Sequence, residues 1–115
     1  MGIAANTATT VLGFSPGTGP RLIIAQIVLG AAASATDVDV WIGTTAASTS
    51  GYLSAITTVV NSTWDTKTVT ALGNFTSGEV VSLNVQGAAA FTVETVGQVA
   101  SGLTGLTSMY SIGVS

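Results

Sequence analysis

The chain has 115 residues, of which only 6% are charged and none is His or Cys, and its formal net charge is −3. Soluble domains usually carry about 25% charged residues, so the polar surface must be built mainly from Thr and Ser. The 2 basic residues cannot neutralise a nucleic-acid backbone or an anionic membrane surface, and the lack of Cys excludes disulfides and zinc–thiolate sites.

The length suits one domain with a single core, so we expect residues 1–115 to form one unit. Residues 1–6 lack the basic start and apolar run of a signal peptide, and we expect them to be a flexible N-terminal arm. The most apolar stretch, residues 22–33, spans about 12 residues, whereas a membrane helix needs about 20. This stretch is therefore expected to be a core strand and its turn.

Gly, Pro, Asn and Ser divide the chain at regular intervals, and short runs of Val, Ile, Thr and Leu lie between these turn signals. The runs predict strands at residues 7–13, 21–29, 36–43, 52–60, 67–72, 79–86, 90–96 and 107–114. Residues 21–29 are apolar on both faces, which predicts a central strand or one covered on both sides. Residues 36–42 and 79–86 alternate apolar with polar residues, as half-buried strands do.

Residues 52–60 allow two interpretations. Leu53, Ile56 and Val60 could line one side of a helix. The β-branched run at residues 57–60 loses side-chain freedom in a helix and fits a pleated strand instead. A strand or irregular segment is therefore favoured over a helix.

Seven or eight short strands at 8–12-residue spacing, with no pattern of crossover helices, are typical of a sandwich. The sequence therefore predicts an all-β fold, a single antiparallel β-sandwich of jelly-roll or immunoglobulin-like topology. Residues 103–115 extend past the main pattern and are expected to form either an added strand or an interface arm.

The residues for catalysis are scarce. A Ser or Thr nucleophile needs a general base, and without His the choice falls to Lys67 or a carboxylate. The glycines at residues 13–19 do not form a phosphate-binding loop, because Pro20 and Arg21 follow where that loop needs Lys and Ser or Thr. We expect neither an enzyme nor a bound cofactor.

Asp37 and Asp39 share one face of a predicted strand, an arrangement that could hold a cation or form an acid–base pair. A calcium site needs four or more further oxygen ligands, and no Asp-rich loop supplies them. The favoured interpretation is that these acids mark the solvent face, or prevent an exposed strand from pairing with another chain. Whether they bind a cation stays open.

Four large side chains are the candidates for an interface or ligand site: Trp41, Trp64, Tyr110 and Met109. Trp41 shares its strand face with Asp37 and Asp39, so it is expected to point outward, where it could stack on a sugar or anchor an interface. The alternative is that a loop or second layer covers it. Trp64 falls in an expected loop, and Tyr110 and Met109 lie in the C-terminal segment.

Three stretches carry a resemblance to a known group of proteins. A Thr-rich opening strand and a Pro-Gly loop precede residues 21–29 (RLIIAQIVL), residues 38–43 form a strand ending in Gly (VDVWIG), and residues 74–85 form a hairpin-like unit (NFTSGEVVSLNV). In this order they resemble the small β-sandwich domains of tailed-phage virions, namely capsid decoration (cement) proteins and head- or tail-fibre domains. The resemblance covers residues 7–102.

This resemblance implies a non-enzymatic virion protein, made in the host cytoplasm, that forms a homo-oligomer, with a trimer favoured. Its partners would be copies of itself and the major capsid or another virion protein. A nearly uncharged surface fits such a role, because it loses little charge hydration on contact. The alternative function is a carbohydrate- or receptor-binding module, at a fibre tip or secreted, with Trp41 and Trp64 stacking on a glycan.

Overall fold

The computed structural model describes residues 1–30, 32, 35–44, 52–60, 65–94 and 107–114. These residues contain strands and no helix that could cross a membrane. The strands are β1 (Gly2–Ile3), β2 (Thr9–Phe14), β3 (Gly19–Leu29), β4 (Thr36–Gly43), β5 (Tyr52–Val60), β6 (Asp65–Phe75), β7 (Val81–Gly87), β8 (Phe91–Glu94) and β9 (Ser108–Gly113).

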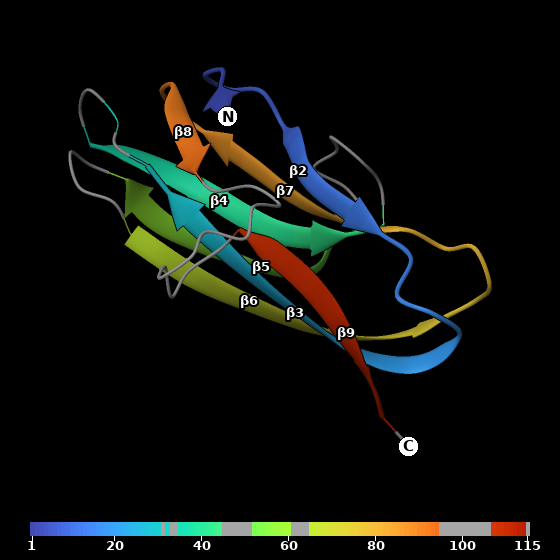
Figure 1. Ribbon diagram of the computed structural model, residues 1–115. Helices are drawn as coiled ribbons and strands as arrows, with labels where there is room; N and C mark the ends of the chain where they lie inside the picture. The colour runs from blue at the N-terminus through green and yellow to red at the C-terminus, as the bar shows by residue number, and fades with distance from the viewer. Residues whose placement is uncertain (31, 33–34, 45–51, 61–64, 95–106, 115) are drawn as a thin grey trace.

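The strands form two antiparallel sheets that lie one over the other (Figure 1). One sheet has the order β1-β8-β3-β6, with β9 also paired to β3, and the other has the order β2-β7-β4-β5. Among the described strands β1 to β8, strands that follow each other along the chain lie in different sheets, except for β4 and β5, which are neighbours in one sheet. This is the strand order of an eight-stranded jelly roll with β9 added. It differs from the immunoglobulin order, in which the first two strands are neighbours. The predicted all-β sandwich is confirmed.

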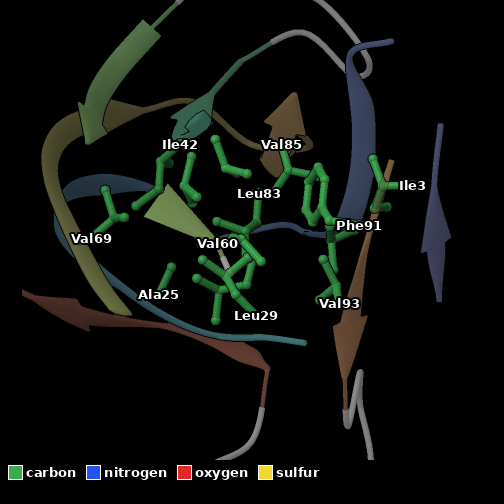
Figure 2. Close-up of a cluster of buried hydrophobic side chains, with 14 of the residues drawn as sticks. Ile3, Ala25, Leu29, Ile42, Val60, Val69, Leu83, Val85, Phe91 and Val93 are labelled. Atoms are coloured by element: carbon green, nitrogen blue, oxygen red, sulfur yellow. The ribbon is translucent and has the colours of Figure 1, made fainter. Parts of the chain in front are cut away.

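The core lies between the sheets and is filled by alternate residues of the strands (Figure 2). In β6, for example, Val69, Ala71 and Phe75 are buried, whereas the residues between them are exposed or half-buried. Successive side chains of a strand point to opposite faces, so each strand supplies one row to the core. The buried side chains labelled in Figure 2 come from both sheets: Ile3, Ala25, Leu29, Ile42, Val60, Val69, Leu83, Val85, Phe91 and Val93.

β3 is the central strand of its sheet, as its apolar sequence predicts. β6 pairs with it along its whole length, from Gly19 to Leu29. On its other edge two strands follow each other: β9 pairs with residues 21–26 and β8 with residues 28 and 29. One side of β3 therefore faces the core, while its other side forms part of the outer surface.

The two ends of the chain take part in the sheet. Residues 1–6 do not form a free arm, because β1 pairs with β8 and the Met1 ammonium group donates a 2.8 Å hydrogen bond to the Val93 carbonyl. Ile3 is 2% exposed and belongs to the core, which explains why this segment is fixed. Of residues 103–115, the structure describes 107–114, and these contain the added strand, β9. Residues 52–60 form a strand and not a helix.

The turn between β6 and β7 connects the two sheets, so residues 74–85 do not form a hairpin. Gly78 has φ = +83°, as the third position of a type II turn requires. The Glu79 carboxylate accepts hydrogen bonds from the Thr76 amide at 2.7 Å and the Thr76 hydroxyl at 2.9 Å. These bonds, the backbone amide first, hold the pKa of Glu79 below its usual range.

Candidate functional site

The outer side of β6, β3 and β9 carries a row of large apolar side chains. Leu22 of β3 lies opposite Leu72 of β6 on one edge and opposite Ile112 of β9 on the other. Ile24 lies in the next outward row, beside Thr70 and Tyr110. Because Ile23, Ala25 and Ile27 point into the core, their neighbours in β3 point outward. The strand pairing therefore assembles one apolar surface from three strands.

We refer to this surface as the apolar face, formed by Leu22, Ile24, Leu72, Tyr110, Ile112 and Val114. Four of these side chains are strongly exposed: Leu72 by 69%, Tyr110 by 52%, Ile112 by 46% and Val114 by 38%. The positions that border them carry Thr68, Thr70, Gln26 and Ser108, none of which is charged. Large apolar side chains gathered in one place on a protein surface often form a functional site.

The charged residues of this sheet border the apolar face or lie beyond it. Arg21 of β3 has its guanidinium group close to Gly17 and Gly113, at one end of that face. Lys67 and Asp65, near the start of the edge strand β6, form a 3.0 Å ion pair. The hydrogen bond from Lys67 lowers the pKa of Asp65. Both side chains are partly exposed to solvent, so the pair contributes little stability. Charges on an edge strand hinder pairing with another chain through that edge.

Trp41 is not the exposed side chain that the sequence predicts. It shares the outward face of β4 with the acids at positions 37 and 39, but it is 0% exposed. The ring of Tyr52 lies against it, with 5.1 Å between the ring centroids and 35° between the ring planes. The alternative expectation, that Trp41 is covered, is therefore correct. Trp41 cannot itself stack on a ligand.

Tyr52 reaches this position because β5 is irregular at its start. Ser54 pairs with Ile42, but Gly43 pairs with Tyr52, so one residue is inserted in β5. Such a bulge redirects the side chains beyond it. Leu53 turns to pack against the core, and Tyr52, 48% exposed, lies over Trp41.

A hollow of about 260 Å³ lies beside this aromatic pair, on the outer side of the sheet that contains β4. We refer to it as the polar hollow, and its lining is Asn6, Asp37, Asp39, Tyr52, Gln86, Gly87 and Ala88. Asp37 and Asp39 are exposed, as expected of a solvent face. They do not protect a sheet edge, because β4 lies between β7 and β5. Within the described residues, no three His, Cys, Asp or Glu side chains gather as a metal site would need.

The other candidates from the sequence fall in three different places. Tyr110 belongs to the apolar face. Met109 points the opposite way and packs against the core, where it lines a hollow with Leu12 and Phe14. Trp64 lies outside the described residues. Leu72 and Tyr52 were not among the predicted site residues. Leu72 could have been found as the one apolar residue among the outward Thr side chains of β6.

Comparisons with protein-family models, with curated proteins and with solved structures find no match. The described residues form two candidate contact surfaces, the apolar face and the polar hollow. They lie on the outer sides of different sheets and share no residue.

Proposed function

We propose that this protein is a non-enzymatic structural component of a virion, a capsid decoration (cement) protein that associates with further copies of itself on the shell. The observation that carries the proposal is the apolar face, where Leu72, Tyr110 and Ile112 are exposed together on one surface. The resemblance of residues 7–102 to phage virion domains supplies the setting.

The size of the apolar face suits a contact between copies. Its exposed side chains present an apolar area on the order of a few hundred Å², the size of the largest apolar patch on a typical protein, which is often functional. A specific interface buries about 800 Å² on each partner. The apolar face would then form the centre of such an interface, and the surrounding Thr, Ser and Gln side chains would form its polar rim.

The lack of charged side chains on the apolar face also favours self-contact there. The chain carries a formal net charge of −3, so copies that met through charged surfaces would repel each other. The apolar face has no charged side chain, and two copies can cover it without burying a carboxylate or an ammonium group. Tyr110 suits the centre of an interface because it combines a large apolar ring with a polar hydroxyl.

The proposal is tested by measuring the oligomeric state of the protein by sedimentation velocity. The wild type is expected to form an oligomer, with the trimer as the favoured state. Leu72→Lys and Tyr110→Lys each place a charge on the apolar face and are expected to give monomers that still unfold cooperatively in urea, at a midpoint that does not change with protein concentration. Val59→Lys is the matched control, because Val59 is 51% exposed on the outer side of the other sheet.

Two results would count against the proposal. One is a wild-type protein that stays monomeric at every concentration and is absent from a mass-spectrometric inventory of purified virions. The other is an oligomer that Val59→Lys disrupts and Leu72→Lys does not, since the contact would then lie on the wrong sheet.

A further inference from the structure

We infer that the polar hollow is a binding site for a neutral saccharide, with Tyr52 as the ring on which a sugar stacks. This inference goes beyond a structural role and does not depend on it. The polar hollow and the apolar face lie on opposite outer sides of the sandwich (Figure 1). A copy bound to a neighbour through its apolar face would still present the polar hollow to solvent.

The aromatic part of the site is held in place before any ligand binds. The Trp41 ring is fully buried and lies 5.1 Å from the Tyr52 ring, centroid to centroid, which supports the tyrosine from one side. Tyr52 itself is 48% exposed. An exposed aromatic ring usually loses conformational freedom when it binds, and a ring already packed on a fixed neighbour loses less. The C–H groups of a sugar pack well on such a ring, whose phenol hydroxyl can also bond to the ligand.

The polar groups around Tyr52 match the hydroxyl groups of a sugar. The Asp37 and Asp39 carboxylates accept hydrogen bonds, and the side-chain amides of Gln86 and Asn6 both accept and donate them. The hydroxyl of Thr57 donates a 2.8 Å hydrogen bond to Oδ1 of Asp39, which orients that carboxylate. A sugar hydroxyl that donates to a carboxylate forms one of the stronger kinds of hydrogen bond.

Backbone hydrogen bonds fix the wall of the polar hollow. The Asn6 amide donates to the Gly87 carbonyl at 2.7 Å, and the Ala88 amide donates to the Asp37 carbonyl at 3.2 Å. Asn6 has φ = +54°, a conformation that Asn adopts more readily than most residues. These contacts join the turn before β2, the strand β4 and the end of β7. The site is therefore preformed, as small-ligand sites usually are.

The lining decides between ligand classes. An anionic ligand would be repelled, because the charged residues of the lining are both carboxylates. A calcium ion takes six to eight oxygen ligands, usually with several carboxylates, and an aromatic ring contributes nothing to it. A volume of about 260 Å³ is slightly below the usual range for drug-sized ligands and suits one or two sugar rings. A neutral saccharide uses both the ring and the polar groups.

The experiment titrates the ¹⁵N-labelled protein with sugars and follows the backbone amide chemical shifts by NMR. The sugars are glucose, galactose, mannose, rhamnose and N-acetylglucosamine, and disaccharides built from them. Sugars that occupy small sites bind in the millimolar range, so each is taken to about 50 mM. At least one sugar is expected to give saturable shifts at residues 37–39, 52 and 86–88. Tyr52→Ala is expected to weaken binding at least about tenfold, since losing about 1.4 kcal/mol of stacking has that effect.

Three controls accompany the titration. Tyr110→Ala removes a tyrosine of similar exposure, 52%, from the apolar face and is expected to leave sugar affinity unchanged. If Tyr52→Ala does not fold, Asp37→Ala takes its place, because Asp37 is exposed and does not belong to the core. Leu72→Lys is expected to bind sugar as the wild type does, which separates this inference from the proposed self-association.

Calcium chloride alone, without sugar, is a separate arm of the experiment. Saturable shifts at Asp37 and Asp39 with Ca²⁺, together with no response to any sugar, would make the polar hollow a cation site and overturn the inference. An absence of saturable shifts with every sugar and with Ca²⁺ would overturn it as well. So would sugar binding that maps to other residues and survives Tyr52→Ala.

Discussion

The hydroxyl of Thr107 and the amide of Val28 are joined by a buried hydrogen bond of 2.9 Å. The same hydroxyl donates a 2.7 Å hydrogen bond to the carbonyl of Glu94. Thr107 is 0% exposed and lies where β8 and β9 meet along one edge of β3. The side chain of Thr107 therefore satisfies two backbone groups at the point where the partner of β3 changes from β8 to β9.

Replacement of this hydroxyl should destabilise the fold. Thr107→Val keeps the shape of the side chain but leaves the Val28 amide and the Glu94 carbonyl without these hydrogen bonds in the core. An unsatisfied buried polar group costs about 1–3 kcal/mol, and we expect a decrease of this size in the free energy of unfolding, measured with urea. Thr107→Ser keeps the hydroxyl and should lose markedly less. Equal losses in the two variants would mean that the methyl group, and not the hydroxyl, matters.

A second prediction concerns Gly73 in β6. The ring of Phe75 occupies the space that a Cβ at Gly73 would need, and that ring is 3% exposed, so it can move only by disturbing the core. Overpacking of this kind costs about 1–3 kcal/mol, and Gly73→Ala should lower the urea midpoint accordingly. Gly13→Ala in β2 is the control: the nearest atom to its Cβ would lie 3.6 Å away, an ordinary contact. A stable Gly73→Ala variant would show that Phe75 is free to repack.

Many of the strands could be predicted from the sequence, because a strand that buries one face shows apolar residues at every second position. β6 shows this well: Val69 and Ala71 alternate with Thr, and the pattern identifies the strand and its inward side. β1 could not be predicted in this way. It is two residues long, and Ile3 is buried only because β8, almost ninety positions later, pairs with it. Its place in the sheet depends on a distant partner that no local pattern contains.

A third prediction follows from the hydrogen bonds of Glu79. Its pKa is lowered in the folded protein, so its stabilising effect is present above the pKa of the unfolded chain and is lost as the pH falls through the folded value. Glu79→Gln should therefore be less stable than the wild type at neutral pH, and the difference should vanish in acid. Urea midpoints of both proteins from pH 7 down to about pH 2.5 test this. A difference that does not change with pH would mean that the carboxylate charge is irrelevant to the turn.

A fourth prediction concerns the salt dependence of self-association. Contacts between charged groups are screened over about 3 Å in 1 M salt, whereas burial of apolar surface is not weakened by sodium chloride in this way. If the apolar face makes the contact, the dissociation constant should be nearly the same in about 0.1 M and about 1 M sodium chloride. Sedimentation equilibrium at both salt concentrations measures it. Dissociation in high salt would indicate a contact made by the few charged residues instead.

The candidate sites were harder to predict than the strands. Tyr110 could be proposed as an interface residue from its type and position alone, but the apolar face appears only when β9, β3 and β6 lie side by side. Trp41 was expected on the outer surface, and its strand face was predicted correctly. Its burial depends on Tyr52, which an inserted residue in β5 directs over it. A bulge leaves no clear mark in the sequence.

The pairing of β1 with β8 has a consequence for how the molecule is made. Gly2 and Ile3 lie beside Thr92 and Phe91, so the first strand has no partner until the ribosome has released most of the chain. The jelly roll pairs mainly strands that are distant in sequence, and folds of this kind form in milliseconds to seconds, slower than helical proteins. Until β1 and β8 pair, the incompletely folded chain exposes apolar surface and unpaired strand edges, through which it can associate with other chains. Low temperature weakens hydrophobic association and should therefore increase the yield of soluble protein.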